Sequence, residues 1–306
     1  MNHKQPLISV NILSYNRKEK LNNSLSKVLN QNYKNIEIIV VDNASTDGTV
    51  EMLKEKYPQV KVIKLKKNIG TSAINEGFRI SKGEYILILD DDSYPLNDTI
   101  EKGVNVFLTN SQIGIVSFEI FNNYSNKTQT DNFIKNGISF IGCGALLLKE
   151  LVHKLNGYSE LFFLFHNELD FSIKTLTIGY KIIYLENAKI IHNQKVELKN
   201  LKKINPLVTE FRYYNYFISY SIFLIKNFSF KNYYIVLVKW LINRGIICFK
   251  YPMFSKSFFK AIIKILSNLK YYINSKNIAP NNIQKLYFPM IPIVDRDYFP
   301  NFKNRI

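Results

Sequence analysis

A series of short apolar runs, each separated from the next by a segment long enough for a helix, limits the folds open to this chain. The runs cover residues 7–13, 36–41, 60–65 and 85–89. After the first run, Leu21, Leu25, Val28 and Leu29 recur at helical spacing. Strands that alternate with helices predict an α/β fold with a doubly wound, mostly parallel sheet. The absence of strict alternation within the runs is typical of strands covered on both faces.

Later segments give weaker signals of the same kind. We expect helices over 97–108 and 167–178 and strands near 115–118, 140–148, 181–185 and 189–192. Residues 122–136 are polar and are predicted to form a loop. Beyond Pro206 the pattern becomes long, basic, aromatic-rich helical segments without a strand signal. These patterns predict two domains, an α/β domain over 1–200 and a helical region over 201–306.

Polar residues follow directly after three of the predicted strands, in the segments 14–17, 42–47 and 90–92. The carboxyl ends of parallel strands meet at one edge of a sheet, where ligands of α/β folds bind. Asp90, Asp91 and Asp92 repel one another unless a cation compensates their charge, and carboxylate oxygens suit Mg²⁺ or Mn²⁺. An isolated triplet would most simply be a solvated turn before a helix. Its position at a strand end favours a metal–diphosphate site, where the cation neutralises a departing group.

These segments resemble, in order, the motifs of family 2 inverting glycosyltransferases with the GT-A fold, most closely the rhamnosyltransferase-like branch. The matching segments are 9–17, 41–48, 68–70 and 89–92. The resemblance extends over roughly residues 6 to 193 and implies transfer of a sugar from a nucleotide sugar, with inversion. Gly142-Cys143-Gly144 lacks the third glycine of a dinucleotide-binding loop, and no zinc-type cysteine pair is present.

The resemblance also implies roles for individual residues. Nucleotide-sugar binding is implied for Ser14, Tyr15, Asp42, Asn68, Gly70, Asn75, Asp90 and Asp91. Metal ligation is implied for Asp92 above all, with Asp90 and His192. The alternatives are a turn-capping role for Asp42, a glycine-led helix start at Gly70, and a structural role for His192.

The catalytic base is expected further along the chain, where an aromatic run leads into acidic residues at 162–170. The family pattern has an acidic pair before its last Asp, and Asn167 replaces one of these carboxylates. The resemblance therefore implies Glu168 as the base that deprotonates the acceptor hydroxyl, with Asp170 as the second candidate. The alternative is an ordinary first turn of a helix, where Glu and Asp are favoured by the helix dipole. His166 lies inside the aromatic run and receives no firm role.

Charge is concentrated in the last part of the chain. From Val196 to Ile306 there are 18 Lys and Arg against 4 Asp and Glu, and 24 of the 43 aromatic residues. Lysines interleaved with aromatic residues are typical of a surface that lies in the headgroup zone of a bilayer. The longest apolar stretches, 217–225 and 233–238, fall short of a membrane-spanning helix, and residues 1–6 lack an export signal. Cys143 and Cys248 are expected to be free thiols in a reducing compartment.

The resulting hypothesis is a metal-dependent glycosyltransferase that uses Mn²⁺ or Mg²⁺ and a UDP- or dTDP-sugar. The acceptor is a hydroxyl of a growing surface glycan, carried on a lipid at the inner face of the cytoplasmic membrane. The protein is expected in the cytoplasm, bound peripherally to that membrane, with no nucleic acid partner. The alternatives are a catalytically idle glycosyltransferase-like protein and a nucleic-acid-binding protein that uses the basic region.

Overall fold

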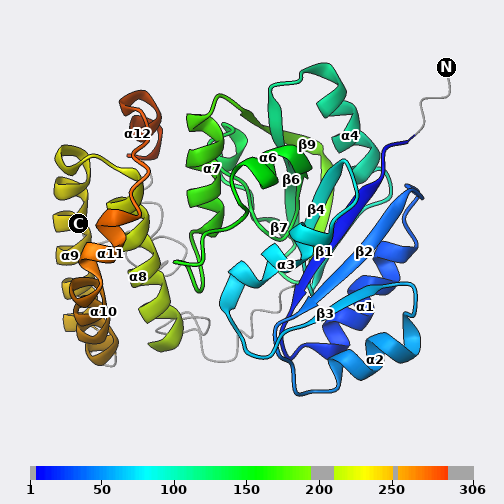
Figure 1. Ribbon diagram of the computed structural model, residues 1–306, viewed down its shortest axis with the longest axis horizontal. Helices are drawn as coiled ribbons and strands as arrows, with labels where there is room; N and C mark the ends of the chain where they lie inside the picture. Colours follow the sequence, from blue (N-terminus) through cyan, green and yellow to red (C-terminus); the bar gives the residue numbers. More distant parts are fainter. Residues whose placement is uncertain (1–4, 194–209, 251–253, 289–306) are drawn as a thin grey trace. The chain divides into compact units, whose positions relative to one another are not determined.

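The computed structural model describes residues 5–193, 210–250 and 254–288. The chain divides into two compact units (Figure 1). Unit 1 comprises Met1–Ser159 and Lys174–Lys195, and unit 2 comprises Glu160–Ile173 and Val196–Ile306. The domain boundary predicted near residue 200 lies outside the described residues.

Unit 1 is built on one mixed sheet of nine strands. The strands are β1 (Ile8–Ser14), β2 (Ile36–Asp42), β3 (Lys61–Lys64), β4 (Tyr85–Asp90), β5 (Ser93–Pro95), β6 (Ile113–Asn122), β7 (Lys127–Thr128), β8 (Ala145–Leu148) and β9 (Lys181–His192). Their order is β3-β2-β1-β4-β8-β6-β9-β5, with β7 paired to β6. Strands β1 to β4 are parallel, β8 is antiparallel to both neighbours, and β9 is parallel to β6. The predicted α/β fold class is confirmed.

Helices cover both faces of this sheet. They are α1 (Lys18–Leu29), α2 (Thr49–Lys56), α3 (Ile74–Ile80, after the short 3₁₀ turn η1, Gly70–Ala73), α4 (Thr99–Thr109), α5 (Asn132–Lys135) and α6 (Lys149–Lys154). Leu21, Leu25 and Val28 of α1 pack with Val10 and Ile12 of β1 in the main core. Alternate residues of a strand point to opposite faces. Asn11 accordingly faces α3 on the other side, where a side chain at Gly77 would collide with its amide.

The register of the parallel strands brings the three polar segments to one edge. Ser14 lies opposite Asp42 across β1 and β2, and Leu13 lies opposite Asp90 across β1 and β4. All three strands therefore end at the same level of the sheet. The polar segments that follow them start from neighbouring positions.

The structure departs from the sequence prediction at several short elements. The predicted loop over 122–136 contains β7 and α5, and the predicted strand over 140–148 is regular only in Ala145–Leu148. The two pieces expected at 181–185 and 189–192 form one strand, β9, with an irregularity opposite Phe118 and Glu119. β5 was not predicted, because three residues ending in a proline are too few to give a periodic signal.

Unit 2 is helical in its described part. Its helices are α8 (Glu210–Asn227), α9 (Phe230–Lys250), α10 (Ser255–Ser267), α11 (Leu269–Asn274) and α12 (Asn281–Tyr287), and α7 (Asn167–Thr177) begins in it. The core is aromatic: Phe217 and Tyr220 of α8 pack against Trp240 of α9. Within the described ranges, none of the helices combines the length and apolarity needed to cross a bilayer.

Candidate active site

The Asp triplet forms a tight turn between β4 and β5. Ser93 Oγ accepts a hydrogen bond from the Asp90 backbone N–H at 2.9 Å and closes this turn. Asp91 and Asp92 are buried, whereas the Asp90 side chain is exposed. The triplet therefore presents one carboxylate to solvent and holds two inside the protein.

Cations from the start of α1 compensate the two buried carboxylates. Arg17 Nη1 lies 3.1 Å from Asp91 Oδ1 and 3.0 Å from Asp92 Oδ2, and Lys20 Nζ lies 2.8 Å from the same Asp92 oxygen. Ser14 Oγ donates to Asp91 Oδ2 at 3.1 Å. Sequence reasoning assigned no role to Arg17 or Lys20, although Arg17 belongs to the first polar segment. Their contacts span more than seventy positions of the chain, so no local pattern indicates them.

Burial dominates the pKa of Asp91, whereas ion pairing dominates the pKa of Asp92, so the two values shift in opposite directions. Burial raises the pKa of Asp91 to about 7, although Arg17 opposes that shift. Burial also acts to raise the pKa of Asp92, but His192, Lys20 and Arg17 together hold it below its ordinary value. Asp92 is therefore ionised at neutral pH, as a metal ligand must be.

His192 reaches the triplet from the end of β9. The pairing of β5 with β9 places it opposite Ser93, and its Nε2 lies 3.2 Å from Asp92 Oδ1. Its other nitrogen, Nδ1, lies 2.8 Å from Gln129 Oε1 and 3.7 Å from Cys143 Sγ. Burial lowers the pKa of His192, but Cys143, Asp92 and Asp90 raise it to about 11.

Asp92 and His192 fit a shared divalent cation. Two atoms that bind one ion at roughly 2.1 Å, at a right angle to each other, are about 3 Å apart. The separation of 3.2 Å between Asp92 Oδ1 and His192 Nε2 is close to this value. Asp92 Oδ1 is also buried, and its contact with His192 Nε2 is an ion pair that a cation between the two atoms would replace. The donor set thus has both the chemistry and the spacing of a metal site.

At the end of β2, Asp42 is fully buried. Its Oδ2 accepts a hydrogen bond from Ser45 N at 3.0 Å, which is the turn-capping contact considered as the alternative role. Its Oδ1 is buried and has no hydrogen-bond partner among the described residues. A buried carboxylate oxygen without a partner is costly, so this atom is suited to a ligand that donates a hydrogen bond.

Asn43, which sequence reasoning missed, joins two of the predicted binding segments. Its Nδ2 donates to Asn68 Oδ1 at 2.9 Å and to the Gly70 carbonyl at 3.0 Å, and its Oδ1 accepts from Ile69 N at 3.0 Å. Gly70 has a φ of +76°, which glycine adopts without strain. The segment 68–70 is thereby tied to the end of β2, beside Asp42.

The remaining predicted nucleotide-sugar residues have different environments. Tyr15 is 45% exposed and is free to stack on a ligand. Asn75 instead holds the Tyr158 backbone: its Nδ2 donates to the carbonyl and its Oδ1 accepts from the N–H, both at 2.8 Å. The binding role predicted for Asn75 therefore needs one of these hydrogen bonds to open.

The two candidate bases, Glu168 and Asp170, both lie in the first turn of α7 and belong to unit 2. Asp170 is buried, and its Oδ1 accepts from Lys226 Nζ at 2.6 Å and from Asn227 Nδ2 at 2.9 Å. Glu168 is partly exposed. The contacts of Asp170 are those of a residue that fixes α7 to the end of α8, and they favour Glu168 as the base.

The backbone just before α7 is strained. Phe165 and His166 have φ values of +68° and +61°, which are uncommon for residues other than glycine. Asn167, buried where the family pattern has a carboxylate, donates from Nδ2 to the Phe162 carbonyl at 3.4 Å. Burial lowers the pKa of His166 to about 3, with a further contribution from Arg244. Strain of this kind is frequent beside functional sites.

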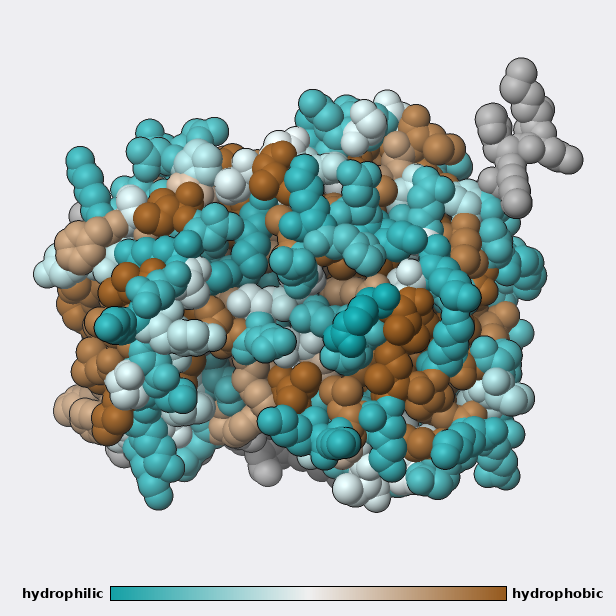
Figure 2. All heavy atoms as spheres, viewed as in Figure 1, coloured by the Kyte–Doolittle hydropathy of each residue, from teal (hydrophilic) through white to brown (hydrophobic). Residues whose placement is uncertain are grey.

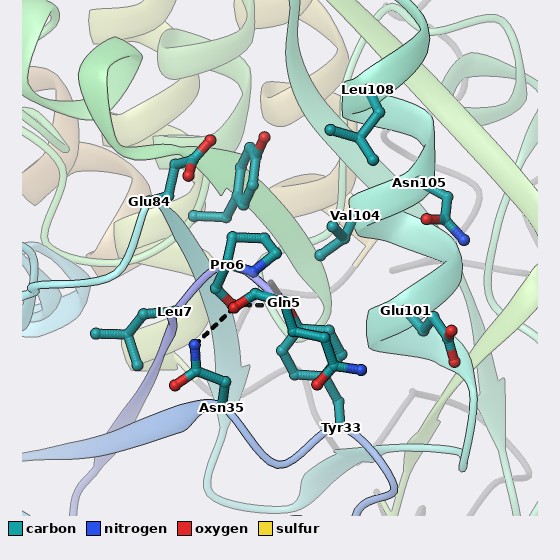
Figure 3. A pocket seen from close by; sticks show the side chains of 11 residues that line it. Gln5, Pro6, Leu7, Tyr33, Asn35, Glu84, Glu101, Val104, Asn105 and Leu108 are labelled. Carbon is teal, nitrogen blue, oxygen red and sulfur yellow. Dashed lines mark hydrogen bonds between the residues drawn. The ribbon is translucent and has the colours of Figure 1, made fainter. Parts of the chain in front are cut away.

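A separate pocket of about 710 Å³ lies at the opposite ends of the strands (Figure 3). Its lining includes Pro6 and Leu7 before β1, Glu84 before β4, and Tyr33, whose hydroxyl donates to the Pro6 carbonyl. Ligands of α/β sheets bind at the carboxyl ends of the strands. We therefore place the active site at the Asp triplet and not in this pocket.

The chain also matches a known protein family. Residues 9–171, which are more than half of the chain, match the model described as glycosyl transferase family 2. The chain belongs to this family. The matched span contains the three polar strand ends and both candidate bases. The rhamnosyltransferase-like branch stays a prediction.

Individual relatives and structures show the extent of the similarity. An Escherichia coli protein, UDP-Glc:alpha-D-GlcNAc-diphosphoundecaprenol beta-1,3-glucosyltransferase WfaP, is 32% identical over 135 residues, 43% of this chain and 50% of that protein. The chain spans half or less of the length of the first curated relatives it matches. Staphylococcus aureus TarS 1–349 with UDP-GlcNAc has a TM-score of 0.58 at 15% identity, covering 95% of this chain and 86% of that one. The Pyrobaculum calidifontis mannosyltransferase PcManGT with GDP-Man and Mn²⁺ has a TM-score of 0.54 at 18% identity, covering 97% and 82%. These two structures support the GT-A-like fold.

Proposed function

We propose that this protein transfers a sugar, with inversion, from a UDP- or dTDP-sugar to a hydroxyl of a growing surface glycan. The observation that carries the proposal is the pairing of Asp92 with His192 at 3.2 Å, inside a family 2 chain and at the joint ends of the parallel strands. A glucosyltransferase relative that uses UDP-Glc and a structural neighbour that binds UDP-GlcNAc support a uridine donor.

The nucleoside would lie across the ends of β1 and β2. The unpartnered Asp42 Oδ1 would accept a hydrogen bond from an N–H of the pyrimidine base, and Tyr15 would stack beside it. The segment 68–70, tied down by Asn43, would border the ribose and phosphates. A rigid arrangement of this kind positions the donor before reaction.

Asp92 and His192 would hold the cation, Mn²⁺ or Mg²⁺, with the exposed Asp90 available beside them. When bound, the cation supplies charge neutralisation for the departing nucleoside diphosphate. Arg17 and Lys20 are 46% and 39% exposed at their side chains, so each has solvent-facing area for a phosphate oxygen. The Mn²⁺ complex of the related fold supports this assignment.

Glu168 would accept the proton of the acceptor hydroxyl as that oxygen attacks the anomeric carbon. Its position in the first turn of α7 follows the strained Phe165–His166 backbone, which fixes the direction from which the helix starts. Asp170 would not take part in proton transfer. Its ion pair with Lys226 would instead hold the first turn of α7 in place.

A screen of nucleotide sugars by thermal shift, with and without Mn²⁺, tests the donor and the metal together. A ligand at 100 times its Kd stabilises a protein by about 2.7 kcal/mol. We expect a UDP- or dTDP-sugar to raise the melting temperature only with metal, and D92N to abolish this rise. D98N is the matched control, because Asp98 is an exposed aspartate that pairs with Lys102. If no nucleotide sugar stabilises the wild type, the proposed function is wrong.

The acceptor is proposed to be lipid-linked, with the protein bound to the inner face of the cytoplasmic membrane. The relative that acts on a diphosphoundecaprenol-linked sugar supports this proposal. In unit 2, α9 exposes large apolar side chains at nearly every fourth position: Phe230, Tyr234, Val238, Ile242, Ile246 and Phe249. The neighbouring α10 exposes Phe259, Ile263 and Leu266 among Lys256, Lys260 and Lys264. Figure 2 shows apolar and hydrophilic side chains interleaved on the face of this unit that it displays.

Flotation with phosphatidylglycerol vesicles tests the membrane surface. Phe249 is 91% exposed, and burying such a side chain contributes about 1.5–3 kcal/mol, so F249S is expected to weaken binding about tenfold or more. L108S is the control, since Leu108 is 69% exposed but lies in unit 1. Equal loss in both variants contradicts the proposal. Tight binding to duplex DNA with indifference to vesicles would favour the nucleic-acid alternative.

A further inference from the structure

A thiol lies beside the metal site. Cys143 is buried just before β8, and its Sγ is 3.7 Å from His192 Nδ1. Asp90, Cys143 and His192 each offer one ligand atom, and these atoms all lie within 4.8 Å of one another. Neither the sequence motifs nor the family 2 reaction assigns a role to this cysteine.

We propose that Asp90, Cys143 and His192 form a site for a thiophilic divalent cation of the zinc type. Its ligand set, one carboxylate, one thiolate and one imidazole, differs from the oxygen-rich sets that select Mg²⁺ or Mn²⁺. The cation displaces the proton of the Cys143 thiol and the Nδ1 proton of His192 to solvent, and it binds the Cys143 sulfur, His192 Nδ1 and an Asp90 oxygen. A fourth position remains open to water, because Asp90 is exposed.

The spacing of the sulfur and the imidazole nitrogen fits such an ion closely. Zinc binds sulfur at about 2.3 Å and nitrogen at about 2.0–2.1 Å in a tetrahedral arrangement, which separates the two atoms by about 3.6 Å. The distance between Cys143 Sγ and His192 Nδ1 is 3.7 Å. Of the three ligands, Asp90 has to adjust, because the three ligand atoms lie within 4.8 Å of one another, and its residue is exposed.

Packing holds the thiol in this position. A side chain at Gly144 would approach Ile190 of β9 to 2.6 Å and Ile120 of β6 to 2.7 Å. The backbone next to Cys143 therefore lies directly against the strand that carries His192. Gln129, which shares His192 Nδ1, is exposed, so its amide can turn into solvent when a cation arrives.

The two cation sites compete for one imidazole. A neutral imidazole has a single lone pair for ligation, on either Nδ1 or Nε2. The thiophilic site uses Nδ1, whereas the site with Asp92 uses Nε2. A zinc-type cation is therefore expected to inhibit sugar transfer by withdrawing His192 and Asp90. This inhibition rests on the proposed function, but the binding itself does not.

Cobalt provides the test, because Co²⁺ occupies zinc-type sites and a bound thiolate gives it a charge-transfer band in the near ultraviolet. The full chain and C248S are expected to show this band, and C143S to lack it while keeping the wild-type circular dichroism spectrum. Added Zn²⁺ is expected to remove the band in the wild type. No band in the wild type, or a band that survives in C143S, overturns the proposal.

A second measurement covers the case in which C143S does not fold. In C248S the sole cysteine is Cys143, because the chain contains two. X-ray absorption at the zinc edge of Zn²⁺-loaded C248S is expected to show one sulfur at about 2.3 Å. Ligands that are all nitrogen and oxygen overturn the proposal. Both measurements omit nucleotide sugar, so they succeed or fail independently of the proposed glycosyltransfer.

Discussion

Replacing Lys226 by methionine is expected to destabilise unit 2 severely while keeping the volume of the side chain. Lys226 is 5% exposed, and its Nζ lies 2.6 Å from Asp170 Oδ1. Removing one partner of a buried ion pair costs about 3–5 kcal/mol, because the remaining charge is left in a medium that solvates it poorly. Asn227 also donates to Asp170 Oδ1, which places the effect of K226M towards the lower end of that range.

The chain contains a ready reporter for this measurement. Trp240 is its single tryptophan and is buried in unit 2, so fluorescence during urea unfolding follows that unit. K239M is the matched control, because Lys239 is exposed on α9 and undergoes the same chemical change. We expect a shift in the free energy of unfolding of roughly 3 kcal/mol for K226M and under about 0.5 kcal/mol for K239M.

A double variant separates the ion pair from simple packing. D170L/K226M removes both charges, and such replacements are often neutral or stabilising relative to the pair. It is therefore expected to recover most of the stability that K226M loses. If K226M unfolds like K239M, or if the double variant is less stable than K226M, the structural role assigned to Asp170 is wrong.

Two further predictions concern the same helix start. E168Q is expected to lower the rate of sugar transfer by about 10²–10⁴-fold, whereas E160Q, at an exposed glutamate of the same unit, should leave the rate unchanged. The pKa of His166, lowered to about 3 by burial, means that the unfolded chain binds its proton first as pH falls. The contribution of neutral His166 to the free energy of unfolding is therefore complete above about pH 6.5. It is lost as the pH falls towards 3, by at most about 1.4 kcal/mol per pH unit. H166N should flatten that slope in Trp240 fluorescence, since asparagine tolerates the local φ of +61°, while H153N, at an exposed histidine, should not.

Much of the first half of the fold could be predicted from the sequence, because buried parallel strands leave continuous apolar runs. Those runs located β1, β2, β3 and β4, and the polar residues after them located the candidate site. β5 and β7 gave no signal, because two or three residues carry no periodicity. The pairing of β5 with β9 could not be foreseen either, yet it is what brings His192 opposite Ser93.

The contacts inside the site were harder to predict than its position. Arg17 and Lys20 compensate Asp92 across more than seventy positions, and Cys143 meets His192 across 49. Such contacts depend on how strands are ordered in the sheet. A motif shows which residue types follow a strand, whereas the strand order decides which of them meet.

The basic residues in the last part of the chain lie partly on the surface and partly in the interior. The lysines interleaved with aromatic residues were expected at a bilayer surface, yet Lys226 is buried against Asp170. Arg244 is buried as well, 3.9 Å from the centre of the Trp240 ring. Exposed lysines on α9 and α10 are available to an anionic surface, where each would contribute about 1 kcal/mol: Lys231, Lys239, Lys256, Lys260 and Lys264. The membrane attraction proposed for this unit would therefore depend on the placement of these lysines beside exposed apolar side chains, and the net charge alone overstates it.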